Sequence, residues 1–334
     1  MLTSRQEKIL ELIIKNYVKT VTPIGSNLLC KILKCSSATI RNDMASLEEL
    51  GYLEKTHTSS GRIPSEKGYR YYVDNLMQPK EMNGEDLLKL QIINNNNKLE
   101  LSDYLKKSLE IISELTDCTS IVLGSKSNEN KLSKVEVLPI SSEIVVAIIV
   151  TDKGHVEHKQ INVTNISTED IQKTVEIINK LLIGTPIDEI NSKLEYEVKP
   201  IINQYVTQHE ALYNAFYDVF NDFAAKNDIS FVGKNNMLNQ PEFNSVEKIK
   251  RIFDKLDSDE IIDSIEEDNG DINIYIGKES KLDDDVTIIK TKYKTSSDEG
   301  TIAIVGPKRM EYDRVVSMLE FIKDNIEGWW YGRK

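Results

Sequence analysis

The 334-residue sequence lacks the features of a disulfide-bonded, secreted or membrane-spanning protein. It has only three cysteines, too few for a disulfide scaffold. No apolar run approaches the roughly 20 residues of a membrane-spanning helix, and the longest, residues 144–150, has the length of a strand. The first residues contain no apolar signal-peptide core. These absences predict a cytoplasmic protein that does not enter a membrane.

Catalytic and metal-binding motifs are missing as well. The sequence contains no G-x-S-x-G, H-E-x-x-H or Rossmann glycine motif. Cys30 and Cys35 are too few to form a zinc site, which needs about four ligands. His155 and His158 are three residues apart on a predicted strand, so their side chains point to opposite faces. The sequence therefore predicts a protein that is not an enzyme and that binds no metal or cofactor.

Charge is distributed unevenly along the chain. With 40% hydrophobic and 29% charged residues, the composition is that of a folded protein, and the length predicts two or three domains. The net charge is −12. Residues 1–76 nevertheless carry 11 Lys and Arg against 8 Asp and Glu, while the rest of the chain carries 31 against 46. A mildly basic N-terminal module on an acidic body would attract a polyanion at one end only.

The basic module follows the pattern of a winged helix-turn-helix. Residues 4–7 form a capping box that opens a first helix, and Ser26 can cap a short second helix. Ser36 and Ser37 cap a third helix over residues 38–50. Two short helices joined by a tight turn are typical of the helix-turn-helix motif. Two strand-like stretches around a polar turn come next and predict a wing.

The third helix divides into an apolar face and a polar face. Ile40, Met44 and Leu47 form a stripe that must face the core. The opposite face begins with small residues, so it can approach base edges closely. There Asn42 can form two hydrogen bonds with adenine, and Arg41 can bind guanine or phosphate. The predicted DNA-binding residues are Ser37, Ala38, Thr39, Arg41 and Asn42 of the helix, with His57, Thr58, Ser59, Ser60 and Arg62 of the wing.

Alternative interpretations exist for both elements. The polar helix face is otherwise an ordinary solvated surface, and the hairpin otherwise belongs to a winged helix that binds protein. A neutral or acidic outer face on the third helix would favour protein binding. The hydroxyl groups of the wing, together with His57 and Arg62, suit phosphates and the minor groove. We therefore predict a module that binds DNA.

The body of the chain predicts two further domains. Three strands separated by short turns form an antiparallel meander followed by helices, so residues 131–228 are predicted to be a self-contained unit. This unit interrupts an α+β domain made of residues 85–130 and 229–330. A single recognition helix contacts few base pairs, so two modules must act together, and the inserted unit is the best candidate for joining them. Its apolar helix stripe is the predicted dimer face, unless the stripe only covers the unit's own meander; it consists of Ile171, Val175, Ile178 and Leu182.

Several segments are longer and more specific than a generic winged helix requires. In the N-terminal module they are SATIRNDM (37–44), LEELGYL (47–53), HTSSGRIP (57–64) and KGYRYYV (67–73), and in the C-terminal half IGKE (276–279) and VGPKRMEY (305–312). These segments closely resemble the HrcA family of bacterial heat-inducible transcription repressors. The resemblance spans nearly the whole chain. Its departures are small, such as Ser37 and Lys308, where the family usually has proline and threonine.

The resemblance implies both a fold and a function. It implies an α+β multidomain protein in which a GAF-like domain is interrupted by a dimerising domain. It also implies a homodimeric repressor of heat-shock chaperone genes that binds an inverted-repeat operator in double-stranded DNA and needs the chaperonin GroEL to stay active. The alternative is a metabolite-sensing winged-helix repressor with a small ligand in the GAF-like domain. An apolar cavity with converging polar groups in that domain would favour this alternative.

Overall fold

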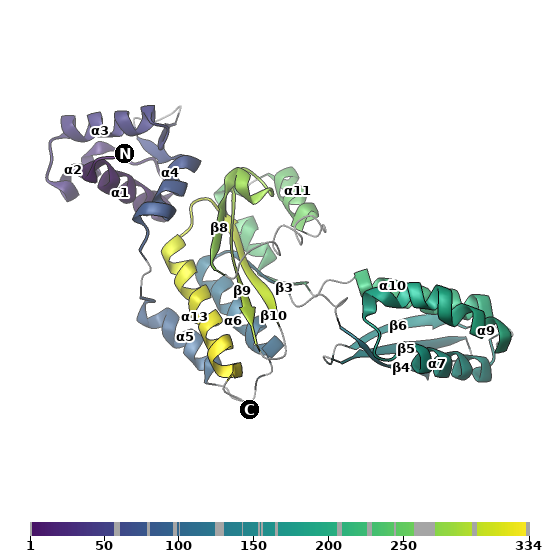
Figure 1. Cartoon of the computed structure of the whole chain (residues 1–334). Coiled ribbons are helices and arrows are strands. Elements are labelled where there is room, and N and C mark those ends of the chain that lie inside the picture. Colours follow the sequence, from purple (N-terminus) through teal and green to yellow (C-terminus); the bar gives the residue numbers. More distant parts are fainter. Residues whose placement is uncertain are drawn as a thin grey trace. The chain divides into compact units, whose positions relative to one another are not determined.

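The computed structural model divides the chain into two compact units. One comprises Met1–Leu123 and Ile229–Lys334, and the other comprises Gly124–Asp228. Both combine helices with antiparallel strands (Figure 1), so the predicted α+β class is confirmed. The structure describes residues 2–56, 61–78, 81–95, 99, 101–123, 130–141, 143–152, 154, 156–163, 166–205, 209–225, 229–243, 245–256, 271–295 and 299–331.

The N-terminal part of the first unit is a winged helix, as predicted. Three helices pack together, a two-stranded antiparallel hairpin forms the wing, and a further helix follows it. The elements are α1 (Ser4–Thr20), α2 (Ser26–Leu33), α3 (Ser37–Glu49), β1 (Leu53–Lys55), β2 (Arg62–Pro64), α4 (Glu66–Tyr71) and the π-helical η1 (Tyr72–Leu76).

Capping side chains determine where α1 and α3 begin. In α1, Thr3 Oγ1 accepts a hydrogen bond from the Gln6 backbone N–H (3.3 Å), and Gln6 Oε1 accepts one from the Thr3 N–H (2.9 Å). The capping box predicted at residues 4–7 is therefore wrong by one residue, because the Thr3 hydroxyl fills the role. In α3, Ser36 Oγ accepts from the Thr39 N–H at 3.2 Å, so Ser36 is the cap and the helix begins at the next residue.

The apolar stripe predicted for α3 lies in the core of the winged helix. Ile40 and Leu47 are fully buried, and Met44 is nearly so. They belong to one hydrophobic cluster with Ile9 and Ile13 of α1. Truncating a buried Ile or Leu to alanine typically costs about 2–5 kcal/mol. This packing therefore determines which face of α3 points to solvent.

A five-stranded antiparallel sheet forms the centre of the first unit. Its strand order is β7-β3-β10-β9-β8. Because β3 precedes residue 124 and β7 follows residue 228, the chain leaves this sheet and later returns to it. The strands are β3 (Thr119–Leu123), β7 (Ile229–Val232), β8 (Asn273–Ile276), β9 (Val286–Lys294) and β10 (Glu299–Pro307).

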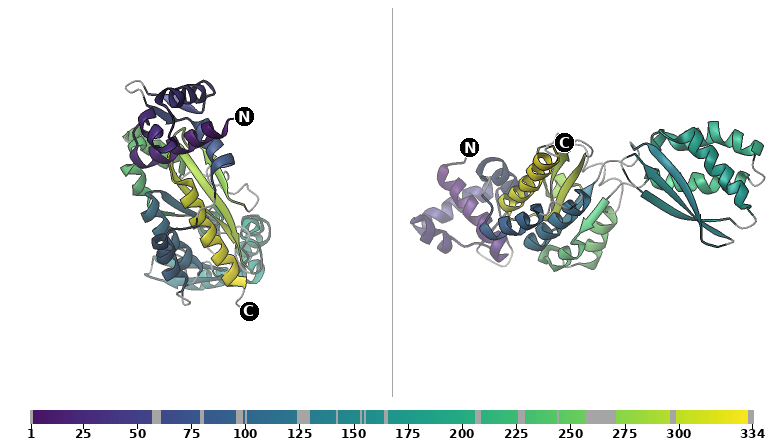
Figure 2. Two further views of the ribbon diagram at one scale, coloured as in Figure 1. Left: turned by 90° about the vertical axis from the view of Figure 1, so that its left-hand side faces the viewer. Right: turned by 90° about the horizontal axis from the view of Figure 1, so that it is seen from below.

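Alternating side chains bury both faces of this sheet. Ile289 and Ile304 belong to the cluster formed with helices α5, α6 and α13, whereas Ile288 and Val305 belong to the cluster formed with α11. Figure 2 shows α5, α6 and α13 together on one side of the sheet. The helical elements are α5 (Gly84–Asn94), α6 (Leu101–Thr116), α11 (Val246–Leu256), α13 (Tyr312–Tyr331) and the short 3-10 helices η4 (Lys234–Asn239), η5 (Pro241–Phe243) and η6 (Gly277–Ser280).

The second unit is a three-stranded meander packed against helices. The strand order is β4-β5-β6, and all pairs are antiparallel. Val145, Ala147 and Ile149 of the central strand are buried against the helices. The elements are β4 (Leu132–Pro139), β5 (Ile144–Thr151), β6 (Val156–Asn162), α7 (Thr168–Leu182), α8 (Ile187–Lys193), the π-helical η3 (Leu194–Val198), α9 (Lys199–Tyr205) and α10 (His209–Ala225).

The apolar stripe of α7 is not an exposed face, so the prediction of a dimer contact through it is wrong. Ile178 and Leu182 are 0% exposed and Ile171 is 7% exposed, while Val175 is partly buried against them. All four pack in the interior of their own unit, where α7 contacts β4. Burying these side chains against the meander removes their apolar surface from water within one chain. They therefore offer a partner little accessible surface.

Candidate nucleic-acid interface

The outward face of α3 presents the residues that the sequence predicts for DNA contact. Ala38, Arg41 and Asn42 are exposed, and Ser37 and Thr39 are half-buried at the start of the helix. The small side chains at this end leave the helix backbone close to the surface. A recognition helix contacts base edges with its N-terminal residues. The structure therefore brings these five residues together at the N-terminal end of α3.

Arg41 connects α3 to the helix before it. Its Nε lies 3.4 Å from Ser26 Oγ, near the beginning of α2, and Ser26 Oγ lies 3.3 Å from Ser37 Oγ. These contacts place a guanidinium and two hydroxyl groups at the junction of the two helices. Arginine and serine side chains are common phosphate ligands in protein–DNA complexes. This junction is therefore suited to a backbone phosphate beside the groove.

An ion pair that the sequence analysis missed links α3 to α1. Arg5 donates to both carboxylate oxygens of Asp43, at 2.6 Å from Nε and 3.3 Å from Nη2. Asp43 is buried although it lies directly after the exposed Asn42. The paired carboxylate raises the pKa of Arg5 above its usual value. No local pattern marks this pair, since its partners are distant in sequence and each is a plausible surface residue alone.

The tip of the wing lies outside the described residues, so the predicted roles of His57, Thr58, Ser59 and Ser60 stay predictions. The base of the wing is described. Arg62 exchanges backbone hydrogen bonds with Ile24, at 2.9 and 3.0 Å. The wing is therefore attached to the loop between α1 and α2 as well as to its own hairpin.

Arg62 is tied to α3 by its side chain. Its Nε and Nη2 lie 2.7 and 2.6 Å from Glu48 Oε2, and the side chain is 16% exposed. The predicted contact between Arg62 and phosphate stays a prediction. The pair with Glu48 adds a second role, because it holds the wing at a fixed angle to α3. A phosphate would compete with the Glu48 carboxylate for the same guanidinium.

Arg62→Ala should weaken binding to operator and random DNA by a similar factor. The reason is that a wing arginine contacts phosphate or the narrow groove instead of a specific base edge. The slope of log affinity against log salt should shrink by about one unit if one phosphate contact is lost. Affinities measured across a salt series on both duplexes check this. Glu48→Gln is the matched variant, because it removes the competing charge and keeps Arg62. An unchanged salt slope with an altered base preference would contradict the phosphate contact.

Family comparisons agree with this geometry. Residues 1–75 match the model described as "Winged helix-turn-helix transcription repressor, HrcA DNA-binding", and residues 102–316 match the model "HrcA protein C terminal domain". The chain belongs to the HrcA family. Membership makes it a DNA-binding transcription repressor and not an enzyme, with residues 1–75 as the DNA-binding domain. The resemblance predicted from the sequence motifs is thereby confirmed.

Full-length relatives support HrcA membership. The "Heat-inducible transcription repressor HrcA" of Lysinibacillus sphaericus is 42% identical over 330 residues, covering 97% of this chain and 96% of the relative. The protein of the same description from Bacillus pumilus (strain SAFR-032) is 39% identical over 333 residues, covering 98% and 97%. One solved structure, titled "Crystal structure of a hypothetical protein at 2.2 A resolution", has a TM-score of 0.67 at 22% identity and covers 100% of both chains. This structure supports the fold alone.

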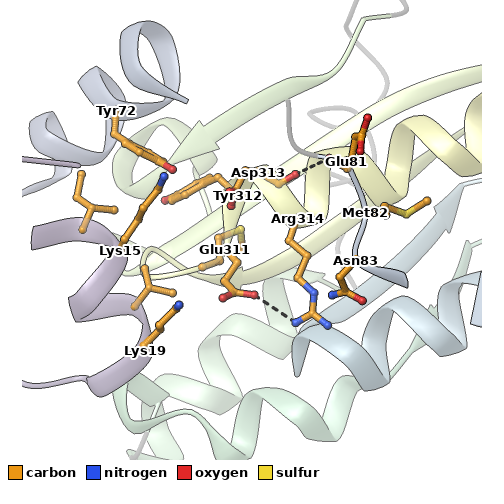
Figure 3. A pocket seen from close by; sticks show the side chains of 14 residues that line it. Lys15, Lys19, Tyr72, Glu81, Met82, Asn83, Glu311, Tyr312, Asp313 and Arg314 are labelled. Atoms are coloured by element: carbon orange, nitrogen blue, oxygen red, sulfur yellow. Dashed lines mark hydrogen bonds and ion pairs between the residues drawn. The ribbon is translucent and has the colours of Figure 1, made fainter. Parts of the chain in front are cut away.

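A small pocket in the first unit gives little support to the metabolite-sensing alternative. The pocket has a volume of about 140 Å³ and lies between Lys15 and Lys19 of α1 and the start of α13 (Figure 3). Its most prominent cation, Arg314, is already held by Asp86 at 2.7 and 2.8 Å and by Glu311 at 3.2 Å. These pairs raise the pKa of Arg314. The Arg314 guanidinium is thus already paired, and the pocket lies against the winged helix instead of inside the α+β domain.

The part of the chain that the structure describes contains neither a membrane-spanning helix nor a cluster of metal ligands. Within the described ranges, no helix is both long and apolar enough to cross a bilayer. The same ranges hold no group of three or more His, Cys, Asp or Glu side chains arranged to bind a metal ion. The free Cys118 is buried, and burial raises the pKa of its thiol to about 12. A thiol with that pKa is protonated at neutral pH and is a poor nucleophile or metal ligand.

Proposed function

We propose that this HrcA-family protein represses heat-shock chaperone genes by binding, as a homodimer, to an inverted-repeat operator. The observation that carries the proposal is the exposed N-terminal face of α3, with Ala38, Arg41 and Asn42, in a DNA-binding domain of this family. Two-fold symmetry in the protein requires two-fold symmetry in the operator. Each winged helix then binds one half-site, and occupied DNA is closed to transcription.

The chemistry of α3 suggests how a half-site is recognised. The Asn42 amide can form two hydrogen bonds with an adenine edge, and Ala38 can touch a thymine methyl group. Arg41 can reach guanine or, through its position beside Ser26, a phosphate. Ser37 and Thr39 supply hydroxyl donors at the helix start. The wing residues His57, Thr58, Ser59, Ser60 and Arg62 are proposed to hold the adjacent backbone or minor groove.

The remaining domains are proposed to assemble and regulate the repressor. Residues 85–130 and 229–330 are assigned to a GAF-like domain, and residues 131–228 to an inserted dimerising domain. The assignment is supported by the sheet connectivity, in which the chain leaves the five-stranded sheet after β3 and re-enters it at β7. Residues 1–77 form the DNA-binding domain of this scheme.

The outer face of the meander is the proposed dimer surface, in place of the buried α7 stripe. Ile144, Val146, Ile148 and Val150 alternate with the buried residues of β5 and so share this face. Leu138 is paired with Val146 and Val156 with Val150, and these two are 50% and 60% exposed. Together with Ile140, these side chains form an apolar patch that runs along β5, while Glu136 and His158 of the flanking strands lie opposite Ile148 on the same face. The patch consists of Leu138, Ile140, Ile144, Val146, Ile148, Val150 and Val156.

A second copy of the same face is the proposed occupant of this patch. Contiguous exposed apolar patches on soluble proteins mark interaction sites. Lys134 and Glu136 lie beside the patch on β4 and form an ion pair with each other. This face carries a positive and a negative charge next to its apolar residues. It can therefore pair with a copy of itself, related by a two-fold axis, in an arrangement that keeps like charges apart. The operator symmetry proposed above requires that arrangement.

The GroEL-type chaperonin is the partner that family resemblance implies. We propose that the active fraction of the repressor depends on assisted folding, so that heat-damaged proteins occupying the chaperonin relieve repression. A marginally stable repressor would respond in this way, because its functional concentration follows the rate at which it is folded.

A mobility-shift assay tests the proposed function. The full-length protein is titrated onto a promoter fragment of a chaperone operon that contains an inverted repeat, with and without purified chaperonin. We expect sequence-specific retardation that chaperonin increases in amplitude. Binding to random DNA of the same length with equal affinity would overturn the operator proposal. An unchanged active fraction with chaperonin would overturn only the chaperonin part.

A further inference from the structure

Helix α4 is attached rigidly to the end of the recognition helix. Its cap, Ser65, donates a hydrogen bond to the Gly51 carbonyl oxygen (2.6 Å), and Lys67 Nζ donates to the Leu50 carbonyl oxygen (2.8 Å). Gly68 faces Tyr52 so closely that an added Cβ would overlap the Tyr52 carbonyl oxygen. Since these contacts involve backbone, α4 cannot move without moving the end of α3.

The opposite side of α4 is attached to the five-stranded sheet. Arg70 Nη1 donates to the Ile274 carbonyl oxygen of β8 at 2.6 Å and to Glu279 Oε2 of η6 at 3.1 Å. Tyr69 is buried here, with its ring centroid 6.0 Å from that of Tyr312. Hydrogen bonds from a guanidinium to a carbonyl and a carboxylate restrict both distance and angle. These contacts join the winged helix to the core at α4.

The turn that receives α4 is shaped for this contact. Gly277 has a φ of 58°, in the left-handed region that favours glycine. An added Cβ at this position would overlap the Glu66 carboxylate, and the Lys278 N–H lies 3.5 Å from Glu66 Oε2. The glycine therefore supplies both the turn and the space for Glu66. The IGKE segment of the sequence, residues 276–279, thus forms part of the surface that α4 contacts.

We propose that α4 and residues 276–279 form a rigid joint that holds the winged helix in one orientation on the five-stranded sheet and so contributes to the half-site spacing the dimer accepts, with Arg70 as its positioning residue. The inference rests on the proposed dimeric binding to an inverted repeat. When two linked modules bind one DNA, the second event is intramolecular, and its strength depends on whether the linkage holds the modules at the right separation. A rigid joint favours one spacing between half-sites. A flexible joint accepts several spacings, but binding at each one is weakened by the entropy lost when the joint becomes ordered.

The assignment makes Arg70 act through geometry and not through DNA contact. Its Nη1 is engaged by the core, and its Nη2 lies 3.0 Å from Asp74 within its own helical segment. Loss of Arg70 should therefore leave the chemistry of α3 intact. Asp74→Asn offers a matched control, because it removes the pair within the helical segment and keeps both contacts with the core.

Binding to duplexes of different spacing tests the joint. Full-length wild type, Arg70→Ala and Asp74→Asn are titrated at fixed salt onto a single half-site and onto inverted repeats whose spacer is native or changed in single-base-pair steps. We expect Arg70→Ala to keep half-site affinity within about twofold, to lose about tenfold on the native repeat, and to flatten the spacing profile. Asp74→Asn should match wild type.

The outcomes separate the joint from the proposed function. If Arg70→Ala shows the same dependence of affinity on spacing as wild type, the proposal of the joint is wrong, and the proposal of a dimeric repressor is unaffected. Equal losses on half-site and repeat assign Arg70 to DNA contact or to folding, and also overturn the joint. If wild type binds the inverted repeat and the single half-site with equal affinity, the proposal that a dimer recognises the operator is itself contradicted. Glu279→Gln tests the charge of this contact from the core side: the amide oxygen can still accept from the Ile276 N–H and from Arg70, so we expect a smaller change in the spacing profile than in Arg70→Ala.

Discussion

Asn42→Ala should weaken binding to the operator by roughly 5- to 150-fold, which corresponds to about 1–3 kcal/mol for a lost bidentate base contact. Affinity for random DNA should change far less. The reason is the position of Asn42 on the exposed face of α3, opposite the buried Ile40 and Leu47. Affinities for operator and random duplexes at one salt concentration measure the effect.

Two variants sharpen this test. Asn75→Ala removes an exposed asparagine from η1, outside the proposed interface, and should bind both duplexes as wild type does. Arg41→Ala should also lose more on the operator than on random DNA if Arg41 contacts a base. Equal losses on both duplexes would mean that Arg41, close to Ser26, contacts only the backbone.

Ile148→Asp should convert the dimer to a monomer and lower operator affinity by about 10²- to 10⁴-fold, because the second binding event is no longer intramolecular. Half-site affinity should stay unchanged. Ile148 lies on the central strand of the patch, between Glu136 and His158 of the flanking strands, and is only half-buried in its own unit, so a carboxylate there would be desolvated chiefly by a partner. Light scattering gives the oligomeric state, and titration of full and half operators gives the affinities.

Lys180→Asp is the matched control for this prediction. It introduces the same side chain on the exposed face of α7, and α7 packs on the opposite side of the sheet from the patch. We expect Lys180→Asp to remain dimeric. A dimeric Ile148→Asp protein, or a monomeric Lys180→Asp protein, would move the interface away from the outer face of the meander.

The winged helix was predictable because its signals are local. Serine caps, the spacing of Ile40, Met44 and Leu47, and the polar turn of the wing all act within a few residues. The same locality explains the error at the start of α1. Thr3 and Ser4 are adjacent capping residues, and only the structure shows that the Thr3 hydroxyl accepts the Gln6 N–H.

The ion pairs of the interface were not predictable, because they join distant segments. Arg5 and Asp43 are 38 residues apart, and Arg62 and Glu48 are 14 apart. Side-chain periodicity reports which face of an element is buried but not which element covers it. These pairs link α3 to α1 and the wing to α3.

The proposed dimer face is a second case in which the sequence pattern shows that a face is buried but not what covers it. The amphipathic pattern of α7 correctly indicated a buried face, but its own sheet covers that face. A better signal was present in the central strand. Residues 144–150 are apolar at every position, and a continuous apolar strand predicts that both faces of its sheet are covered. Helices cover one face, and the other is the proposed contact with a second chain.

The most direct test of the account is the binding of full-length protein to three duplexes at one salt concentration. The first carries the intact inverted repeat of a chaperone-operon promoter, the second has one half-site scrambled, and the third has both scrambled. We predict at least about a hundredfold preference for the intact repeat over the single half-site, and weaker, non-specific binding to the third. Equal affinities for all three would contradict operator recognition by a dimer of winged helices.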